Sequence, residues 1–355
     1  MAKKTIKAID ALEEAQRIAL APFVFQTSVS LRKLGVFSYI FDNRDANGVS
    51  LLDICEALKI PEYGLGVLLE MAESAGLVKK NDAANFELTK TGYFLNYDKT
   101  VSVNLNFTND VCYKGLFHLK DSIKNQKPEG LKEFGNWNTI YEGLSHLSSE
   151  VQQSWFEFDH HYSDGIFTEA LQIVYSKNPK HIYDIGGNTG KFALQCLSNS
   201  EDITITIYDL SGQLKKALKN VKDAGFGSRI NGKEIDWLAP NPQLEKGADL
   251  IWMSQFLDCF SEDEIVKILK SCVAVMDDTM PLLITETFTD RQKFDNAQYV
   301  LEATSLYFTA LANGNSKMYP ATVFIKLVEK AGLKVEEDIK LGEYHTMLVC
   351  KKNEA

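Results

Sequence analysis

The chain has 355 residues, a formal net charge of −10, 45% hydrophobic residues and 24% charged residues. This length suggests two domains, and the composition is ordinary for a globular protein. The acidic balance argues against a protein that binds phosphate backbones, and no apolar run approaches the roughly 18 residues of a membrane span, so we expect neither nucleic acid nor a membrane as a partner.

The N-terminus and the cysteines are typical of a cytoplasmic protein. The opening segment MAKKTIKAIDALEEAQ has no apolar signal core and carries acids early, so it predicts neither secretion nor organelle import. The six cysteines are scattered, and none forms a C-x-x-C pair. This pattern favours reduced thiols in a cytoplasmic chain over disulfides, and it predicts no metal site.

Residues 8–40 predict helices that need a partner surface. Apolar residues recur among acids and amides over 8–21, Pro22 interrupts, and 23–39 continues with a more apolar face. Such helices pack either on the chain's own second domain or on a second copy of the chain. We favour the second alternative, a homodimer formed through the N-terminal helices.

Residues 49–95 have the pattern of a winged helix. The predicted elements are a short helix capped by Ser50, a second helix and two strands, at 51–58, 62–75, 77–80 and 86–89. A winged helix first suggests DNA binding. However, the only charged residues of the second helix are the acids Glu62, Glu70 and Glu73, which offer nothing to phosphates. A structural or dimerising role is therefore favoured.

Residues 100–178 predict helices that are rich in aromatic side chains. The stripe from Trp155 to Ser163 places polar tips beside rings, an arrangement that suits a mostly apolar small-molecule pocket. Core packing explains most of these aromatics. Within the stripe, His160 and His161 are candidates for assisting catalysis, and the alternative for each is a structural role.

The segment 180–210 predicts a strand, a glycine turn, a helix and a second strand. The turn holds three glycines: Gly186, Gly187 and Gly190. Asp209 ends the second strand, 25 residues after Asp184. In a doubly wound sheet such a turn admits a ligand to the backbone, and an acid ending the next strand can hold two ribose hydroxyls. The segment therefore predicts a nucleoside site.

The glycine spacing distinguishes two kinds of nucleoside. A dinucleotide fingerprint needs G-x-G-x-x-G, but Asn188 and Lys191 stand where its second and third glycines belong. A nicotinamide oxidoreductase is therefore disfavoured. The arrangement D-x-G-G-x-x-G, led by Asp184, instead resembles the first motif of class I methyltransferases that use S-adenosylmethionine (SAM), whose turn wraps the amino-acid end of the cofactor.

Strands and helices alternate after residue 210. Strands are expected at 229–236, 248–255 and 281–287, helices at 211–224, 262–276, 299–311 and 321–331, and a final antiparallel pair at 334–337 and 345–351. The fold class is thus α/β, with a doubly wound, mainly parallel sheet, and the resemblance of the D-x-G-G-x-x-G turn implies that this sheet is a Rossmann-like methyltransferase sheet. A mostly α-helical winged-helix domain precedes it.

Over nearly its whole length the chain resembles the SAM-dependent small-molecule O-methyltransferases of the hydroxyindole and plant-phenol type. The matching pieces are YDIGGNTG at 183–190, YDL at 208–210, EIDW at 234–237, ADLIWMSQFLDCFSEDEIVKILKSC at 248–272 and the wing GLVKKNDAANFELTKTGYFL at 76–95. The resemblance implies a helical arm and winged-helix dimerisation domain over 1–100, a helical linker lining the substrate pocket over 101–175 and a SAM-binding domain over 176–355.

The resemblance also implies SAM as the cofactor and assigns roles around it. The turn contacts the methionine part of SAM, Asp209 holds the ribose hydroxyls, and Leu210 packs on the adenine. Asp236 accepts from the adenine amino group and Trp237 stacks on the ring, although a surface turn is the alternative for this pair. The expected cofactor-binding residues are Asp184, Gly186, Gly187, Gly190, Asp209, Leu210, Asp236, Trp237 and Ser254.

The chain departs from the family at the catalytic base. The family's histidine, in a segment L-H-D-W-x-D-E, aligns with Asp258 of the segment LDCFSED. A family glutamate that orients the base falls on Met318, with Tyr319 at the following arginine. Another family glutamate, after the last core strand, is kept as Glu286.

We therefore expect Asp258, desolvated among apolar neighbours, to take the proton of a small aromatic acceptor, with Glu286 beside it and help from His160 or His161. Methylation of oxygen is favoured. Methylation of carbon is the alternative, because the family's histidine is missing. A non-catalytic, SAM-binding or regulatory protein of the same fold remains a third possibility.

Overall fold

The computed structural model describes residues 6–353, and its contacts divide the chain into two compact units with the division between Asn109 and Asp110. Residues 101–109 belong with the N-terminal unit, and 110–175 belong with the sheet domain. The sequence suggested a boundary at residue 100 and a separate linker over 101–175. That three-part division stays a prediction.

The N-terminal unit is a winged helix with two helices before it and two after it. Its elements are α1 (Ala8–Ala19), α2 (Ala21–Lys33), α3 (Val36–Asp42), α4 (Leu51–Leu58), α5 (Glu62–Ser74), β1 (Val78–Lys80), β2 (Phe86–Leu88), α6 (Lys90–Tyr97) and α7 (Lys99–Asn106). The side chain of Ser50 accepts a hydrogen bond from the Asp53 N–H and caps α4, as expected. The wing strands pair antiparallel, and α3, α4, α5 and the wing share one apolar core.

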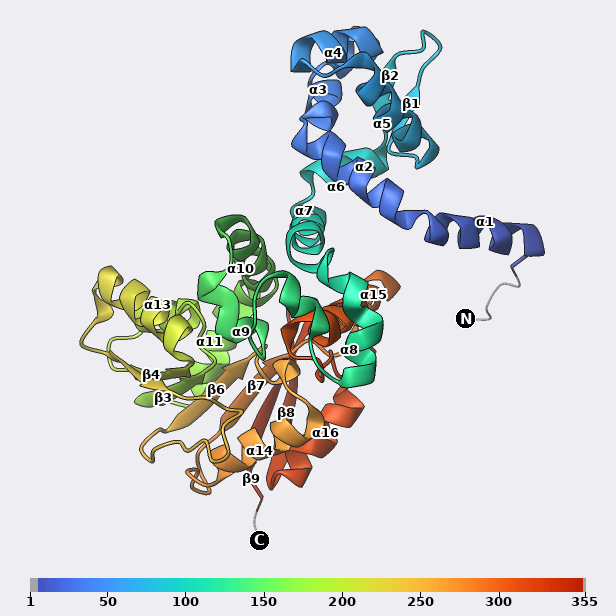
Figure 1. Cartoon of the computed structure of the whole chain (residues 1–355). Coiled ribbons are helices and arrows are strands. Elements are labelled where there is room, and N and C mark those ends of the chain that lie inside the picture. Colours follow the sequence, from blue (N-terminus) through green and yellow to red (C-terminus); the bar gives the residue numbers. More distant parts are fainter. Residues whose placement is uncertain (1–5, 354–355) are drawn as a thin grey trace. The chain divides into compact units, whose positions relative to one another are not determined.

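Helix α1 leaves its apolar face exposed within this unit. None of its described residues is buried, and Ile9, Leu12 and Ile18 are each more than half exposed. Exposed apolar side chains at helical spacing are typical of an interaction surface. Figure 1 shows α1 as an extended helix that projects away from the winged-helix core.

The C-terminal unit is built on a sheet whose seven strands, among the described residues, follow the order β5-β4-β3-β6-β7-β9-β8. The strands are β3 (His181–Ile185), β4 (Thr204–Asp209), β5 (Ile230–Glu234), β6 (Leu250–Ser254), β7 (Leu282–Glu286), β8 (Leu333–Leu341) and β9 (His345–Lys352). The pairings among the first five strands in chain order are all parallel, whereas β9 pairs antiparallel with both β7 and β8. The prediction of a mainly parallel, doubly wound sheet is confirmed.

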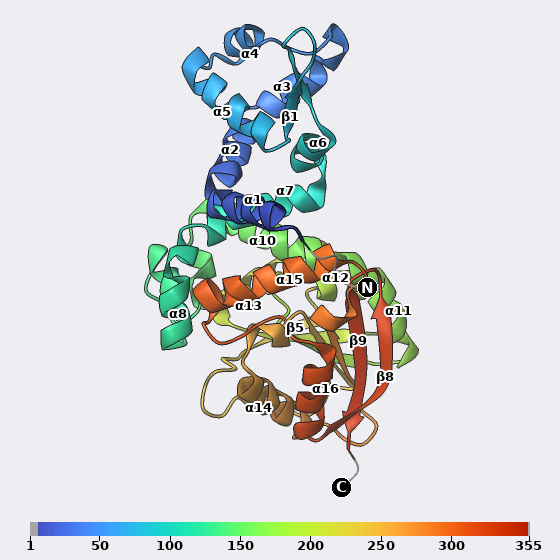
Figure 2. The same ribbon diagram turned by 90° about the vertical axis from the view of Figure 1, so that its right-hand side faces the viewer.

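Helices cover both faces of this sheet (Figures 1 and 2). The α-helices of this unit are α8 (Leu119–Asn125), α9 (Ile140–Gly143), α10 (Ser149–Ser163), α11 (Phe167–Ser176), α12 (Lys191–Ser198), α13 (Ser211–Val221), α14 (Glu262–Val273), α15 (Asp295–Tyr307) and α16 (Ala321–Lys330). One apolar core joins α14 and α16 to the sheet, and another joins α11, α12 and α13 to its opposite face. Side chains alternate between these cores along each strand, so both faces of the parallel strands are buried.

Among the described residues, no helix combines the length and apolar character needed to cross a membrane.

Candidate active site at the carboxyl edge of the sheet

The strand order reverses beside β3, because β4 lies on one side of it and β6 on the other. The chain leaves these two strands toward opposite ends of the sheet. In open α/β sheets the crevice outside the carboxyl ends of the strands, at this point, is where ligands bind. The turn after β3 and the residues that end β4, β6 and β7 therefore define the candidate site.

The glycine turn has a backbone that favours glycine at two of its positions. Gly186 has a φ of 70° and Gly190 a φ of 79°, both in the left-handed region that favours glycine. A Cβ on Gly186 would lie 2.3 Å from the ring of Phe256, so that ring packs directly on the turn. The Gly186 N–H donates to the Tyr208 carbonyl at 2.9 Å, which fixes the turn to the end of β4.

Asp209 follows Tyr208 and is held by the backbone on both oxygens. Oδ2 accepts from the Asn188 N–H at 2.8 Å, and Oδ1 accepts from the Leu210 N–H at 2.7 Å. Burial raises the pKa of Asp209 to about 7, although these two donors oppose the rise. Each carboxylate oxygen can accept a second hydrogen bond, so the group keeps capacity for ribose hydroxyls.

Asp184 lies under the turn and is 2% exposed. In the described part of the chain its Oδ2 is buried without a hydrogen-bond partner, and a Cβ on Gly187 would come within 2.9 Å of that oxygen. Burial, and then repulsion from Asp209, raises the pKa of Asp184 to about 8. The carboxyl group of Asp184 thus lies within electrostatic reach of that of Asp209.

Asp236 and Trp237 follow β5 and differ in exposure. Asp236 is exposed, and its Oδ1 accepts from the Leu238 N–H at 2.9 Å, which is a turn contact. Trp237 is buried, and its ring centroid lies 6.0 Å from that of Phe256 in an edge-on arrangement. Its Nε1 has no hydrogen-bond partner within residues 6–353. The indole therefore lies near the turn, whereas the Asp236 carboxylate is engaged with its own loop.

The ends of β6 and β7 bring Asp258 and Glu286 together. Asp258 lies in a short 3-10 turn, η8 (Leu257–Cys259), and is 6% exposed, while Glu286 ends β7 and is 2% exposed. Glu286 Oε1 accepts from the N–H groups of Phe256 and Leu257 at 3.2 and 2.9 Å, which orients the turn that carries Asp258. Glu286 Oε2 has no hydrogen-bond partner among the residues that the structure describes.

These two carboxyl groups hold protons more tightly than ordinary acids. Burial raises the pKa of Asp258 to about 7. Burial, and then the charge of Asp258, raises the pKa of Glu286 well above its usual range. An aspartate with a pKa near neutrality is a far better general base at pH 7 than an exposed one.

His160 and His161 lie on α10 and have different surroundings. His160 Nδ1 lies 3.2 Å from Asp164 Oδ1, and its Nε2 lies 3.2 Å from the Thr189 hydroxyl. The imidazole therefore connects α10 to the glycine turn. The His161 ring packs edge-on against Tyr162, with centroids 5.1 Å apart.

Sequence reasoning missed two further contacts between α10 and the turn. Asp159 Oδ2 accepts from the Asn188 side-chain amide at 2.8 Å, and Asp164 Oδ2 accepts from Lys191 Nζ at 2.5 Å. The partners are separated by 29 and 27 residues along the chain, so no local pattern could have paired them. Asn188 and Lys191, which break the dinucleotide fingerprint, are the turn residues that make these contacts.

Aromatic side chains surround the Asp258 end of the site. Trp155 Nε1 donates to the Tyr307 hydroxyl at 2.8 Å, and the Tyr141 ring packs edge-on against Trp155. The Tyr319 hydroxyl donates to the Phe260 carbonyl at 2.7 Å. The aromatic stripe predicted from the sequence thus joins residues from α9, α10, α15 and the segment before α16.

Several buried polar atoms of this region have no hydrogen-bond partner in the described structure. They include Tyr141 Oη, Asp184 Oδ2, Asn188 Oδ1, Trp237 Nε1, Ser254 Oγ, Gln255 Oε1 and Glu286 Oε2. Such atoms are rare in folded proteins, because each costs about 1–3 kcal/mol. Their concentration at the carboxyl ends of β3, β5, β6 and β7 indicates a place where a polar ligand binds.

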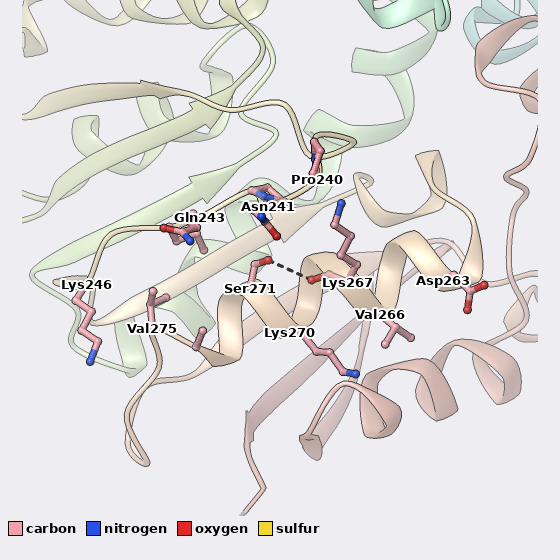
Figure 3. A pocket seen from close by; sticks show the side chains of 13 residues that line it. Pro240, Asn241, Gln243, Lys246, Asp263, Val266, Lys267, Lys270, Ser271 and Val275 are labelled. Atoms are coloured by element: carbon pink, nitrogen blue, oxygen red, sulfur yellow. Dashed lines mark hydrogen bonds between the residues drawn. The ribbon is translucent and has the colours of Figure 1, made fainter.

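A separate hollow of about 680 Å³ lies between the loop 240–246 and α14 (Figure 3). Lys246, Lys267 and Lys270 are among its lining residues, and Lys267 Nζ donates to the Ala239 carbonyl. None of the predicted site residues lines this hollow. It is a feature of the outer surface of α14, distinct from the carboxyl edge.

Comparison with known families agrees with this arrangement. Residues 13–86 match the Dimerisation2-like domain, and residues 116–334 match the O-methyltransferase domain, which covers more than half of the chain. The chain belongs to the O-methyltransferase domain family. The predicted resemblance is therefore confirmed, as is the expectation of a helical dimerisation domain ahead of the methyltransferase-type fold.

Relatives of this O-methyltransferase-family chain are distant. The O-methyltransferase SfmM3 of Streptomyces lavendulae is 26% identical over 184 residues, which are 50% of this chain and 54% of that protein. The aclacinomycin 10-hydroxylase RdmB of Streptomyces purpurascens is 26% identical over 107 residues, 30% of this chain and 28% of that protein. The chain thus spans about half the length of these curated relatives, or less.

A solved structure extends the likeness of the fold to the whole chain. The mitomycin 7-O-methyltransferase MmcR has a TM-score of 0.74 and 17% identity, and the alignment covers 97% of this chain and 98% of that one. At this identity the likeness concerns the fold.

Proposed function

We propose that the protein is a SAM-dependent methyltransferase that moves a methyl group to a small, aromatic acceptor, with oxygen as the favoured atom. One observation carries the proposal: buried carboxyl groups of raised pKa gather at the carboxyl ends of four adjacent parallel strands. Asp184, Asp209, Asp258 and Glu286 would be relieved by a cationic ligand. SAM carries a positive sulfonium, whereas a nicotinamide dinucleotide carries an anionic pyrophosphate, which such a site disfavours.

The residues at the turn fit the parts of SAM. Gly186, Gly187 and Gly190 would admit its methionine end to the backbone, with Asp184 beneath them. Asp209 would take the ribose hydroxyls on its remaining lone pairs, and Leu210 would pack on the adenine. Trp237, whose Nε1 is orphaned, would lie against the ring, and Ser254 Oγ is a further unpaired group within the site. Asp236 would reach the adenine amino group by exchanging its contact with Leu238.

The acceptor would lie at the aromatic end, between Trp155 and Asp258. When bound, SAM supplies a methyl group from a positively charged sulfur and becomes S-adenosylhomocysteine (SAH), in which that sulfur is a neutral thioether. The chain's own residues hold the acceptor and take its proton: Asp258 Oδ receives the hydroxyl proton, and Glu286 orients the turn that carries it. A base near neutrality is worth about 10²–10⁴-fold for an acceptor such as a phenol.

The two histidines would have different roles. The contacts of His160 with Asp164 and Thr189 support a positioning role, while His161 stays a candidate for contact with the acceptor. The exposed apolar face of α1 and the match of residues 13–86 to a dimerisation domain support a homodimer. The six free cysteines fit a cytoplasmic chain.

Two measurements test the proposal. Calorimetry with SAM and with NADH should give micromolar binding heat with SAM and none with NADH. Release of SAH in the presence of a panel of phenols should then identify an acceptor. Binding of NADH in place of SAM would refute the cofactor, and SAM binding without turnover of any phenol would refute O-methylation.

The alternatives stay distinct in the same assays. Methylation of carbon would give SAH and a product whose added methyl group is not removed by reagents that cleave ethers. A regulatory protein would bind SAM without releasing SAH. One relative is called a hydroxylase. The mass of the product distinguishes that reaction from methylation, because hydroxylation adds an oxygen and leaves SAM unconsumed.

A further inference from the structure

Asp159 is a carboxyl group that sequence reasoning assigned no role. It lies on α10, next to His160 and within the aromatic stripe, and it is partly buried. Its Oδ2 accepts from the Asn188 side chain at 2.8 Å, so it contacts the turn that follows β3. Asn188 has a left-handed φ of 49°, and its N–H donates to Asp209. Asp159 and Asp209 thus hold the same turn residue from two sides.

The charge of Asp159 acts on both ends of the site. It contributes to the raised pKa of Asp209 at the cofactor end and to that of Asp258 at the acceptor end, in each case after the larger effect of burial. Asp159 is thus within electrostatic reach of both the cofactor end and the acceptor end of the site. In a methyl transfer the sulfur must lie between the nucleoside end and the acceptor, because donor, methyl and acceptor are aligned in the reaction.

The neighbours of Asp159 on the helix are already paired. Asp164 is held by Lys191 and His160, and the Nε2 of His160 faces the Thr189 hydroxyl. His160 Nδ1 lies 3.8 Å from Asp159 Oδ2, which is longer than its 3.2 Å contact with Asp164. Burial raises the pKa of Asp159 to about 6 despite these groups, so the local cations do not fully offset the cost of its charge.

We propose that the Asp159 carboxylate binds the positive charge of the methyl donor and so lets the site distinguish SAM from its neutral-sulfur product. This inference rests on the proposed function. An opposite charge within a few ångströms stabilises a charged group by about one to three pKa units, or about 10–1000-fold. The sulfonium loses its charge when the methyl leaves, so the attraction to Asp159 is lost in SAH, and product release becomes easier.

Asp159→Asn separates charge from structure. The amide oxygen of the replacement can still accept from the Asn188 side chain, so the turn keeps its anchor while the charge disappears. Dissociation constants of SAM and of SAH are measured by calorimetry for wild type and variant. We expect SAM to bind about tenfold more weakly and SAH to change little, so the preference for SAM over SAH falls by about that factor.

Two further variants isolate the cause. Asn188→Ala removes the anchor and keeps the charge, so both ligands should weaken together while their ratio stays that of wild type. Asp164→Asn removes a carboxylate of the same helix that Lys191 already neutralises, and its SAM to SAH ratio should also stay unchanged. These variants keep the inference testable even if Asp159→Asn does not fold.

The outcomes point in different directions. An equal loss for SAM and SAH in Asp159→Asn, or a reduced ratio in Asn188→Ala, would overturn the inference and leave Asp159 as an anchor of the turn. Wild-type protein that binds neither ligand would instead overturn the proposed function. A ratio that falls only in Asp159→Asn supports the assignment.

Discussion

The role of Asp258 as a base can be tested by replacing it with asparagine. Asp258→Asn keeps the size of the side chain and removes the carboxylate with which the 3-10 turn η8 would take the acceptor's proton. Because Glu286 orients that turn through the N–H groups of Phe256 and Leu257, the backbone should stay in place. SAM affinity should therefore survive while turnover falls.

The expected loss of turnover follows from the burial of Asp258. Burial raises the pKa of Asp258 to about 7, about three units above that of a free aspartate, so the group is both largely ionised slightly above neutrality and basic enough to receive a proton. General base catalysis contributes about 10²–10⁴-fold. We expect turnover to fall by about 100-fold above pH 7, the lower end of that range, since a phenol ionises partly by itself.

The assay is release of SAH as a function of pH, with acceptor at saturation. A base works when deprotonated, so wild-type turnover should rise as the pH passes upward through about 7, and Asp258→Asn should lack this rise. Asp159→Asn removes a negative charge that, after burial, helps to raise the pKa of Asp258, so this variant should move the rise to lower pH. Asp263→Asn changes an exposed carboxylate five residues along and serves as the control.

The reasoning would fail on either of two results. Turnover of Asp258→Asn within about threefold of wild type would show that the base lies elsewhere, because general base catalysis is worth at least about 100-fold. A pH-dependent rise that persists unchanged in this variant would assign the titration to another group.

Three further predictions concern the turn, its acids and α1. The folded-state pKa of Asp184 is raised to about 8, so protonated Asp184 stabilises the fold at low pH and this stability is lost as the pH rises through that value. Asp184→Asn should therefore raise the free energy of unfolding above pH 8 by about 1–3 kcal/mol in urea titrations. An unchanged midpoint would contradict the burial argument. Gly186→Ala places a Cβ 2.3 Å from Phe256 at positive φ and should lower stability by about 1–3 kcal/mol and abolish SAM binding in calorimetry, whereas wild-type affinity would show that the turn tolerates a side chain. Leu12→Asp combined with Ile18→Asp should shift size-exclusion elution from dimer to monomer, and a persistent dimer would place the interface elsewhere.

Most elements were predictable because their signals are local. The strand 181–185, the glycine turn and the helix after it lie within one short window, and they form as expected. The final strand pair was harder. The sequence predicted a strand over 334–337, whereas β8 continues to Leu341, because Glu336, Glu337 and Asp338 hide the pattern of an exposed edge strand. The predicted helix 299–311 begins earlier, at Asp295, and ends in a π turn after Tyr307.

The residues of the candidate site also divide into those that the sequence could locate and those that it could not. Asp209 and Asp184 could be located because Asp209 ends β4 and Asp184 is the last residue but one of β3, directly before the glycine motif. The surroundings of His160 could not, since its partner Thr189 lies 29 residues away and reaches it only through the packing of α10 on the turn. Asp159 belongs to the aromatic stripe that the sequence indicated, but its contact with Asn188 could not be predicted, because that contact needs both the helix and the left-handed turn to be in place.

The acidic edge also explains why the stability of this fold and its function should oppose each other. Four carboxyl groups of raised pKa, together with Asp159, cost free energy wherever they ionise without a cation, and a protein selected for stability alone would replace them with amides or apolar side chains. A cationic ligand removes that cost on binding and returns it when its charge is lost. The same carboxylates that weaken the empty fold would therefore favour the charged donor over the neutral product, which is the direction a methyl transfer requires.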